Sequence, residues 1–143
     1  MIQNFRQQMD TSITQMHHLH TEANKLLARN KGENYDQALR LMQQSDRQAT
    51  QVLNRIWAFL GQFEYDRNPL QKPFAACEGH AQTIGTLLET HGAILPFAAT
   101  AAGRQEPDHL LTLLDHEKQI LQASREARDT CSRLPVERLR SKP

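Results

Sequence analysis

Hydrophobic residues recur every three or four positions along most of this chain, and the clearest run lies between residues 74 and 102. Alternating steps of three and four keep side chains on one face of a helix, as in the seam of a coiled coil. The positions of the run are Phe74, Cys77, Ala81, Ile84, Leu88, His91, Leu95, Ala98 and Ala102. All are apolar or small except His91, so the pattern predicts a long helix with one histidine on its buried face.

Three further runs with the same spacing predict helices over residues 2–30, 35–63 and 107–134. Each run has about three apolar positions in two turns, which is typical of a helix that faces the core of a bundle. The segments between the runs contain glycine or proline, which favour turns. These segments include Gly32, Asn68-Pro69 and Gly103. The chain is therefore expected to be all-α, with four helices joined by short connections.

The residue numbers of the apolar positions also predict which helices face each other. In two antiparallel helices joined by a short turn, the numbers of facing residues add up to a constant. The total is 65 for the first two helices and 208 for the last two, and apolar positions then mostly meet apolar positions. Pairs with these totals include Met9 with Ile56 and Met16 with Ala49, and Cys77 with Cys131 and His91 with Glu117. This register predicts an antiparallel up-down-up-down four-helix bundle.

The third helix contains Pro96, which removes the backbone hydrogen bond to residue 92 and predicts a kink. Residue 92 is a glycine, which leaves room for the proline ring. Pro135 is expected to end the fourth helix. We therefore expect a four-helix bundle over residues 1–135 and a basic, frayed tail over residues 136–143.

Composition and charge exclude several classes of protein. The chain has 143 residues, enough for one domain with a core of its own, and its net charge of +1 indicates neither a nucleic-acid nor an acidic partner. It has no run of 18 apolar residues and no charged segment leading into an apolar one near its start, so a membrane is not expected. A cytoplasmic location follows from these observations, and Cys77 and Cys131 are then expected to be thiols.

One polar side chain from each predicted helix falls at the same height of the bundle. His91 faces Glu117 by the register of the last two helices, and His20 and Asp46 lie at the same level of the first two. Imidazoles and carboxylates that project inward from four helices bind iron, manganese or zinc in bundle proteins. The other interpretation is a hydrogen-bonded polar layer in which His91 and Glu117 fix the helix register.

The pair Cys77 and Cys131 lies at one end of the bundle by the same register. A buried free cysteine behaves as a small hydrophobic residue, so we expect both to contribute to core packing. A disulfide is the alternative, and it requires Cα atoms within about 7 Å.

The segment from Arg104 to His109 reads Arg-Gln-Glu-Pro-Asp-His, which resembles the Arg-x4-His motif of the HEPN ribonucleases. The resemblance covers six residues. It implies a helical bundle in which Arg104 and His109 act together on RNA. Gln105 stands where that family usually has Asn, Asp or His, and Pro107 interrupts the motif.

Aromatic residues gather near the end of the second helix. Trp57 and Tyr65 fall outside the apolar stripe, which makes them candidates for an interface with another protein. Because no catalytic motif appears, the sequence favours a protein that works by binding another protein as an adaptor, chaperone or regulator, or by forming a homodimer. The alternative functions are a metal-binding enzyme or sensor and the ribonuclease.

Overall fold

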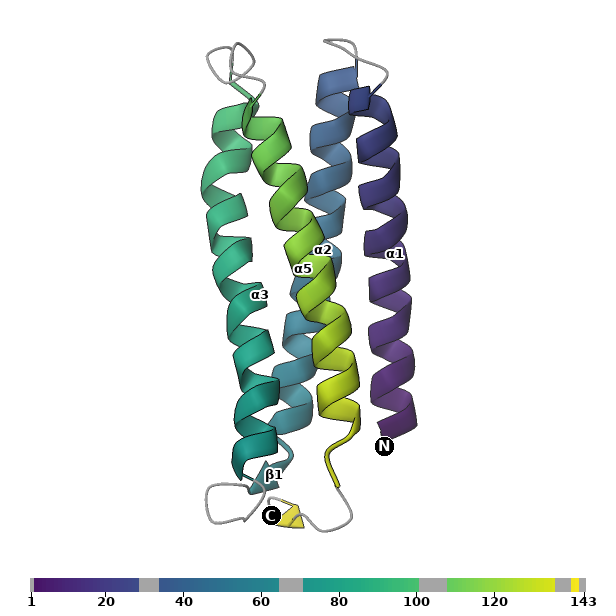
Figure 1. Ribbon diagram of the computed structural model, residues 1–143, viewed down its shortest axis with the longest axis vertical. Helices are drawn as coiled ribbons and strands as arrows, with labels where there is room; N and C mark the ends of the chain where they lie inside the picture. The colour runs from purple at the N-terminus through teal and green to yellow at the C-terminus, as the bar shows by residue number, and fades with distance from the viewer. Residues whose placement is uncertain (1, 29–33, 65–70, 101–107, 136–139, 142–143) are drawn as a thin grey trace.

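The structure is a computed structural model that describes residues 2–28, 34–64, 71–100, 108–135 and 140–141. Nearly all of these residues lie in four long helices (Figure 1). The helices are α1 (Ile2–Ala28), α2 (Tyr35–Leu60), α3 (Gln71–Ala98) and α5 (Asp108–Ser132). The predicted all-α four-helix bundle is confirmed.

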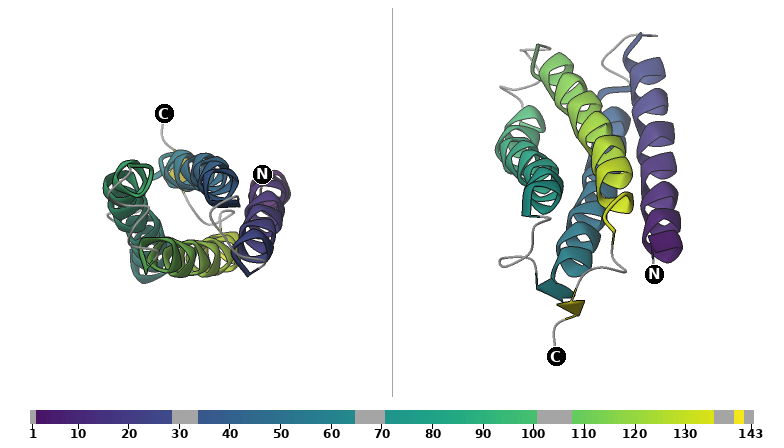
Figure 2. Two further views of the ribbon diagram at one scale, coloured as in Figure 1. Left: turned by 90° about the horizontal axis from the view of Figure 1, so that it is seen from above. Right: turned by 60° about the horizontal axis from the view of Figure 1, so that its bottom comes forward.

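The helices form a ring in which each packs against its two neighbours, and α2 and α5 also make contact across it. α1 packs most extensively on α2 and α3 most extensively on α5, while α1 with α5 and α2 with α3 complete the ring. Figure 1 shows that the chain passes along the bundle in alternating directions from helix to helix, and the end view in Figure 2 shows the ring. Each helix therefore presents one apolar face to a shared core.

A short pair of strands lies at the end of the bundle where α2 finishes. β1 (Phe63–Glu64) pairs with β2 (Arg140–Ser141) in antiparallel register, with Phe63 opposite Ser141. The prediction that Phe63 lies in the second helix is wrong, because α2 ends at Leu60. Phe63 is nevertheless buried. The pairing of Arg140–Ser141 also differs from the expected frayed tail, whose other residues (136–139 and 142–143) lie outside the described part.

The other predicted boundaries agree within a few residues. Asn34 occupies the position before α2, but its side chain donates a hydrogen bond to the Leu26 carbonyl at 3.1 Å instead of capping α2. It thereby links the end of α1 to the start of α2. Gly32 lies outside the described residues. Pro96 lies inside α3 as predicted, and the kink that it implies stays a prediction.

The core divides into two apolar clusters along the bundle axis. The larger one, the lower core, lies at the bottom of Figure 1 and contains four phenylalanines. The smaller one, the upper core, is made mostly of leucine and alanine with Tyr35 and Met42. The lower core takes its buried residues from 5–16, 49–63, 74–84 and 120–134, and the upper core from 23, 35–42, 95–98 and 110–114. The gap between the clusters falls at His91 on α3 and at Glu117 on α5.

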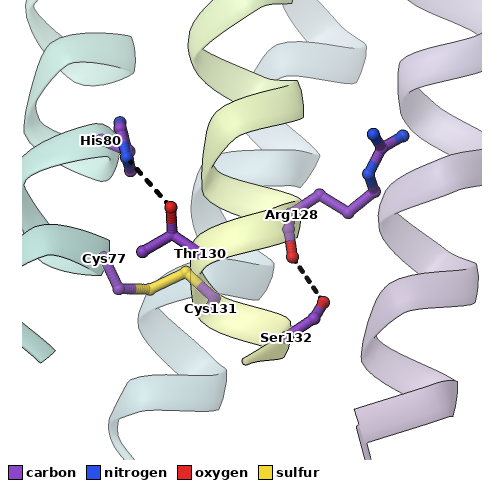
Figure 3. The surroundings of a disulfide bond; sticks show 6 residues. All are labelled: Cys77, His80, Arg128, Thr130, Cys131 and Ser132. Atoms are coloured by element: carbon purple, nitrogen blue, oxygen red, sulfur yellow. Dashed lines mark hydrogen bonds between the residues drawn. A yellow bond between two sulfur atoms is a disulfide. The ribbon is translucent and has the colours of Figure 1, made fainter. Parts of the chain in front are cut away.

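Cys77 and Cys131 form a disulfide in the lower core, with Cα atoms 5.3 Å apart (Figure 3). Both residues are completely buried. The expectation of two thiols is therefore wrong. That expectation rested on a cytoplasmic location, and a disulfide weighs against that location because disulfides are rare in the cytosol. The register that predicted this pair holds at this end of the bundle.

Candidate metal centre

Three polar side chains from three helices meet in the gap between the lower and upper cores. His91 projects from α3, Asp46 from α2 and Glu117 from α5, and one ligand atom of each lies within 4.8 Å of the others. The side chains of His91 and Glu117 are almost fully enclosed, while that of Asp46 is 18% exposed. We call this group the polar triad.

The apolar stripes explain why these side chains point inward. His91 and Glu117 occupy stripe positions of α3 and α5, so the packing that buries their neighbours buries them as well. Asp46 follows the stripe residue Ser45, so its carboxylate enters from the edge of the stripe and keeps some contact with solvent. The triad is therefore inside the bundle, with one side open at Asp46.

Both nitrogens of His91 face oxygen acceptors. Nε2 lies 3.1 Å from the backbone carbonyl oxygen of Leu113, and Nδ1 lies 3.0 and 3.1 Å from the two carboxylate oxygens of Asp46. A carbonyl oxygen only accepts, so Nε2 carries a proton and donates it to Leu113. The Nδ1 lone pair of a neutral imidazole would then point at a carboxylate. A proton or a cation is needed between them.

Glu117 adds a second carboxyl group to the same space. Its Oε1 lies 4.0 Å from Nδ1 of His91, and among the described residues neither carboxyl oxygen has a partner at hydrogen-bond geometry. Burial, reinforced by the negative charge of Asp46, raises the pKa of Glu117 to about 9, and the nearby Ser45 hydroxyl offsets only part of this rise. Glu117 thus favours its protonated, uncharged form in the metal-free protein, and its carboxyl group is buried without a hydrogen-bond partner among the described residues.

The structure brings together three of the four residues of the predicted polar layer. His91 and Glu117 face each other, and Asp46 joins them, but His20 belongs to a different environment. The side chain of Asn24 donates to Nε2 of His20 at 3.0 Å, and burial, with His17 and Lys118 nearby, lowers the pKa of His20. The side chain of His20 is only partly buried, and its ring is not among the ligand groups that meet at the triad. His20 therefore does not contribute to the triad.

Sequence reasoning missed the groups that orient the triad. The carbonyl of Leu113 is a backbone group in a helix, so no residue type marks it as an acceptor for His91. Ser45 is a small residue in the apolar stripe of α2, so its sequence position does not mark it as a buried neighbour of Glu117. His116 packs its ring 5.5 Å from the ring of His91. This residue is not among those missed, because its position one residue before Glu117 puts it within a turn of the predicted polar layer.

The remaining predicted site residues are separate from the triad. Trp57 is 40% exposed on α2. His109 lies in α5 and packs edge-on against Phe97, with ring centres 4.9 Å apart. Tyr65 and Arg104 lie outside the described residues, so their interface and ribonuclease roles stay predictions.

Comparison with known proteins adds no function. No protein family, curated protein or solved structure matches this chain. None of the helices that the structure describes is long and apolar enough to cross a membrane. The functional argument therefore rests on the geometry and chemistry of the polar triad.

Proposed function

We propose that this protein binds a divalent transition metal ion in the core of its bundle, through Nδ1 of His91 and the carboxylates of Asp46 and Glu117. The observation that carries the proposal is the commitment of Nε2 of His91 to the Leu113 carbonyl, which turns Nδ1 toward two carboxyl groups. Histidines that bind metals almost always donate their other N–H to a carbonyl or carboxylate in this way.

A metal ion explains more of the triad than a proton does. A proton on Nδ1 would pair His91 with Asp46 and leave the oxygens of Glu117 buried without a partner. A buried carboxyl group without a partner is costly, whereas an ion shared by all three residues supplies a partner for each. The protonated His91–Asp46 pair, acting only to fix helix register, is the structural alternative.

The donor set indicates the kind of ion. One imidazole nitrogen and two carboxylate oxygens suit Mn²⁺, Fe²⁺ or Zn²⁺ better than a thiolate-seeking ion such as Cu⁺. Three protein ligands also leave at least one coordination position for water or a substrate. The proposal therefore covers an enzyme or a sensor, and in both cases the ion links α2, α3 and α5.

Metal binding can be measured on protein that has been stripped with a chelator. We expect about one Mn²⁺, Fe²⁺ or Zn²⁺ per chain by elemental analysis after reloading. We also expect a rise in the unfolding temperature, because a ligand that binds only the folded state stabilises it. His91→Ala and Glu117→Gln should lose both effects, while the control His17→Ala/His18→Ala, which removes two exposed histidines of α1, should keep them. Loading that survives in His91→Ala would refute the site.

A second candidate function is the protein interaction that the sequence favours. It is supported by the exposure of Trp57, a large aromatic residue of the kind that anchors interfaces. A homodimer is the simplest partner. Light scattering of the wild type and Trp57→Ala tests it, and a wild-type protein that is monomeric at all concentrations would argue against self-association.

A further inference from the structure

Two links join α3 to α5 at different heights of the bundle. The disulfide joins Cys77 to Cys131, and the polar triad joins His91 to Glu117. Cys77 and His91 are 14 positions apart in α3, and Glu117 and Cys131 are 14 positions apart in α5. In both helices this separation is about four turns, or about 21 Å. One register of α3 on α5 therefore satisfies both links.

The α3–α5 contact nearest the disulfide is made mainly by small side chains. By the same register Ala81 lies opposite Ala127, and Ile84 lies opposite Ser124, and all four are buried. Alanine and serine interlock weakly, so this part of the contact does little to prevent one helix from shifting along the other. Nearer the triad the same register pairs larger side chains, Leu88 with Ile120.

We propose that the disulfide controls the metal affinity of the polar triad by fixing the position of α3 on α5. The inference rests on the proposed function. With the disulfide formed, His91 stays opposite Glu117 and both are held near Asp46 for an incoming ion. Once the bond is broken, α3 shifts or rotates against α5, and the three ligands are no longer held together for binding.

The disulfide is completely buried, so a reductant reaches it when the end of α5 opens. Cys131 lies one residue before the end of α5, where helices open most readily. In Figure 3 the disulfide lies beside His80 and Thr130, and His80 Nε2 is 3.4 Å from the Thr130 hydroxyl oxygen. The side chain of His80 is 26% exposed.

The coupling must act in both directions. If the disulfide form binds an ion about tenfold more tightly than the dithiol form, the bound ion must make the disulfide harder to reduce by the same factor. For this two-electron couple, a factor of ten corresponds to a potential lower by about 30 mV.

The experiment compares Mn²⁺ affinity with and without the disulfide, from the electron paramagnetic resonance signal of free Mn²⁺. Mn²⁺ prefers oxygen and nitrogen ligands, so it avoids the thiols that reduction exposes. A water-soluble phosphine reduces the bond: the phosphine becomes a phosphine oxide with an oxygen from water, and the two protons of that water go to the two thiols. The reduced wild type, desalted without air, and Cys77→Ala/Cys131→Ala should both bind Mn²⁺ about tenfold more weakly.

The matched control is Ile56→Ala, which removes a buried side chain of α2 from the lower core and leaves both α3–α5 links intact. We expect it to keep the wild-type Mn²⁺ affinity. Equal Mn²⁺ affinity of the disulfide and dithiol forms would overturn the inference and leave the proposed function standing. The same would follow if Ile56→Ala lost as much Mn²⁺ affinity as the protein without the disulfide. Absence of Mn²⁺ binding by the disulfide form would overturn both proposals.

The reduction potential provides a reading that does not depend on the variants. Equilibration of the wild type in thiol–disulfide buffers, with and without Mn²⁺, should show a potential about 30 mV lower in the presence of the ion. An unchanged potential would contradict the coupling even if the double variant failed to fold.

Discussion

The lower and upper cores are built from the same four helices but are held together differently. The lower core has the disulfide and a chain of aromatic contacts, in which the rings of Phe5 and Phe59 stack with centres 4.3 Å apart. The upper core has smaller side chains, and its notable polar contact is the hydrogen bond from the Tyr35 hydroxyl to the Ala98 carbonyl at 2.7 Å. Stability is therefore expected to be concentrated in the lower core.

This difference shows how a bundle can hold a polar site inside an apolar interior. The triad lies where one cluster ends and the other begins, so its burial does not interrupt the packing of either. The lower core contains the disulfide between α3 and α5, and we expect the upper core, which has no such link, to open more readily. The comparison predicts unequal effects of equivalent changes at the two ends.

Truncation of a large side chain should have its strongest effect in the lower core. Phe74→Ala removes a fully buried ring and should lower the free energy of unfolding by about 3–5 kcal/mol. Leu110→Ala in the upper core should cost less, about 2–3 kcal/mol. Urea denaturation of the two variants measures the difference. A greater loss in Leu110→Ala would reverse the comparison.

Removal of the disulfide should cost a similar amount. The bond closes a loop with a sequence separation of 54 residues, and loss of this constraint on the unfolded chain corresponds to about 4 kcal/mol. Cys77→Ala/Cys131→Ala should therefore unfold at lower urea concentration than the wild type, with helical circular dichroism retained in the absence of denaturant. A midpoint equal to that of the wild type would show that the lower core does not depend on this bond.

The pH dependence of stability tests the gap between the cores. With a folded-state pKa of about 9 against a usual value of 4.5, Glu117 binds a proton in the folded state that the unfolded state releases. Its stabilising contribution is complete below pH 4.5 and is lost as pH rises toward 9. Metal-free protein should therefore become less stable between pH 6 and pH 8, by at most about 3 kcal/mol.

Glu117→Gln provides the control for this pH effect, because an amide does not titrate. Its free energy of unfolding should be nearly constant over the same range. If the wild type and Glu117→Gln show the same pH dependence, another group is responsible.

The smallest expected effect concerns Gly79 in α3. Gly79→Ala places a methyl group where nothing lies within 4 Å and restricts the unfolded chain. It should stabilise the protein by about 0.5–1 kcal/mol without changing metal affinity. Chemical denaturation checks the gain, and a destabilised variant would mean that the contact at this position is tighter than the structure indicates.

Much of this architecture was predictable because long helices leave a clear periodic pattern. The register correctly paired Cys77 with Cys131, and it placed His91 opposite Glu117. It was less successful where the neighbours depend on how the two hairpins dock. His20 lies at the predicted height but in the environment of Lys118, because numbers within one hairpin do not determine the rotation of α1 relative to α5.

Two other features depend on information that residue types do not carry. The acceptor for His91 is the main chain of Leu113, which any residue would provide. The expectation of two thiols rested on the expected compartment, whereas the helix register already placed the two cysteines opposite each other. Proximity was the better guide, because two buried sulfurs in facing positions are already close enough to bond.

The most direct test of the central claim is the location of the ion itself. Anomalous diffraction at the manganese or zinc absorption edge, from crystals of metal-loaded protein, should give one strong peak about 2.0–2.2 Å from Nδ1 of His91 and from oxygens of Asp46 and Glu117. A peak found only at exposed histidines such as His17 and His18, with the triad unchanged, would contradict the account.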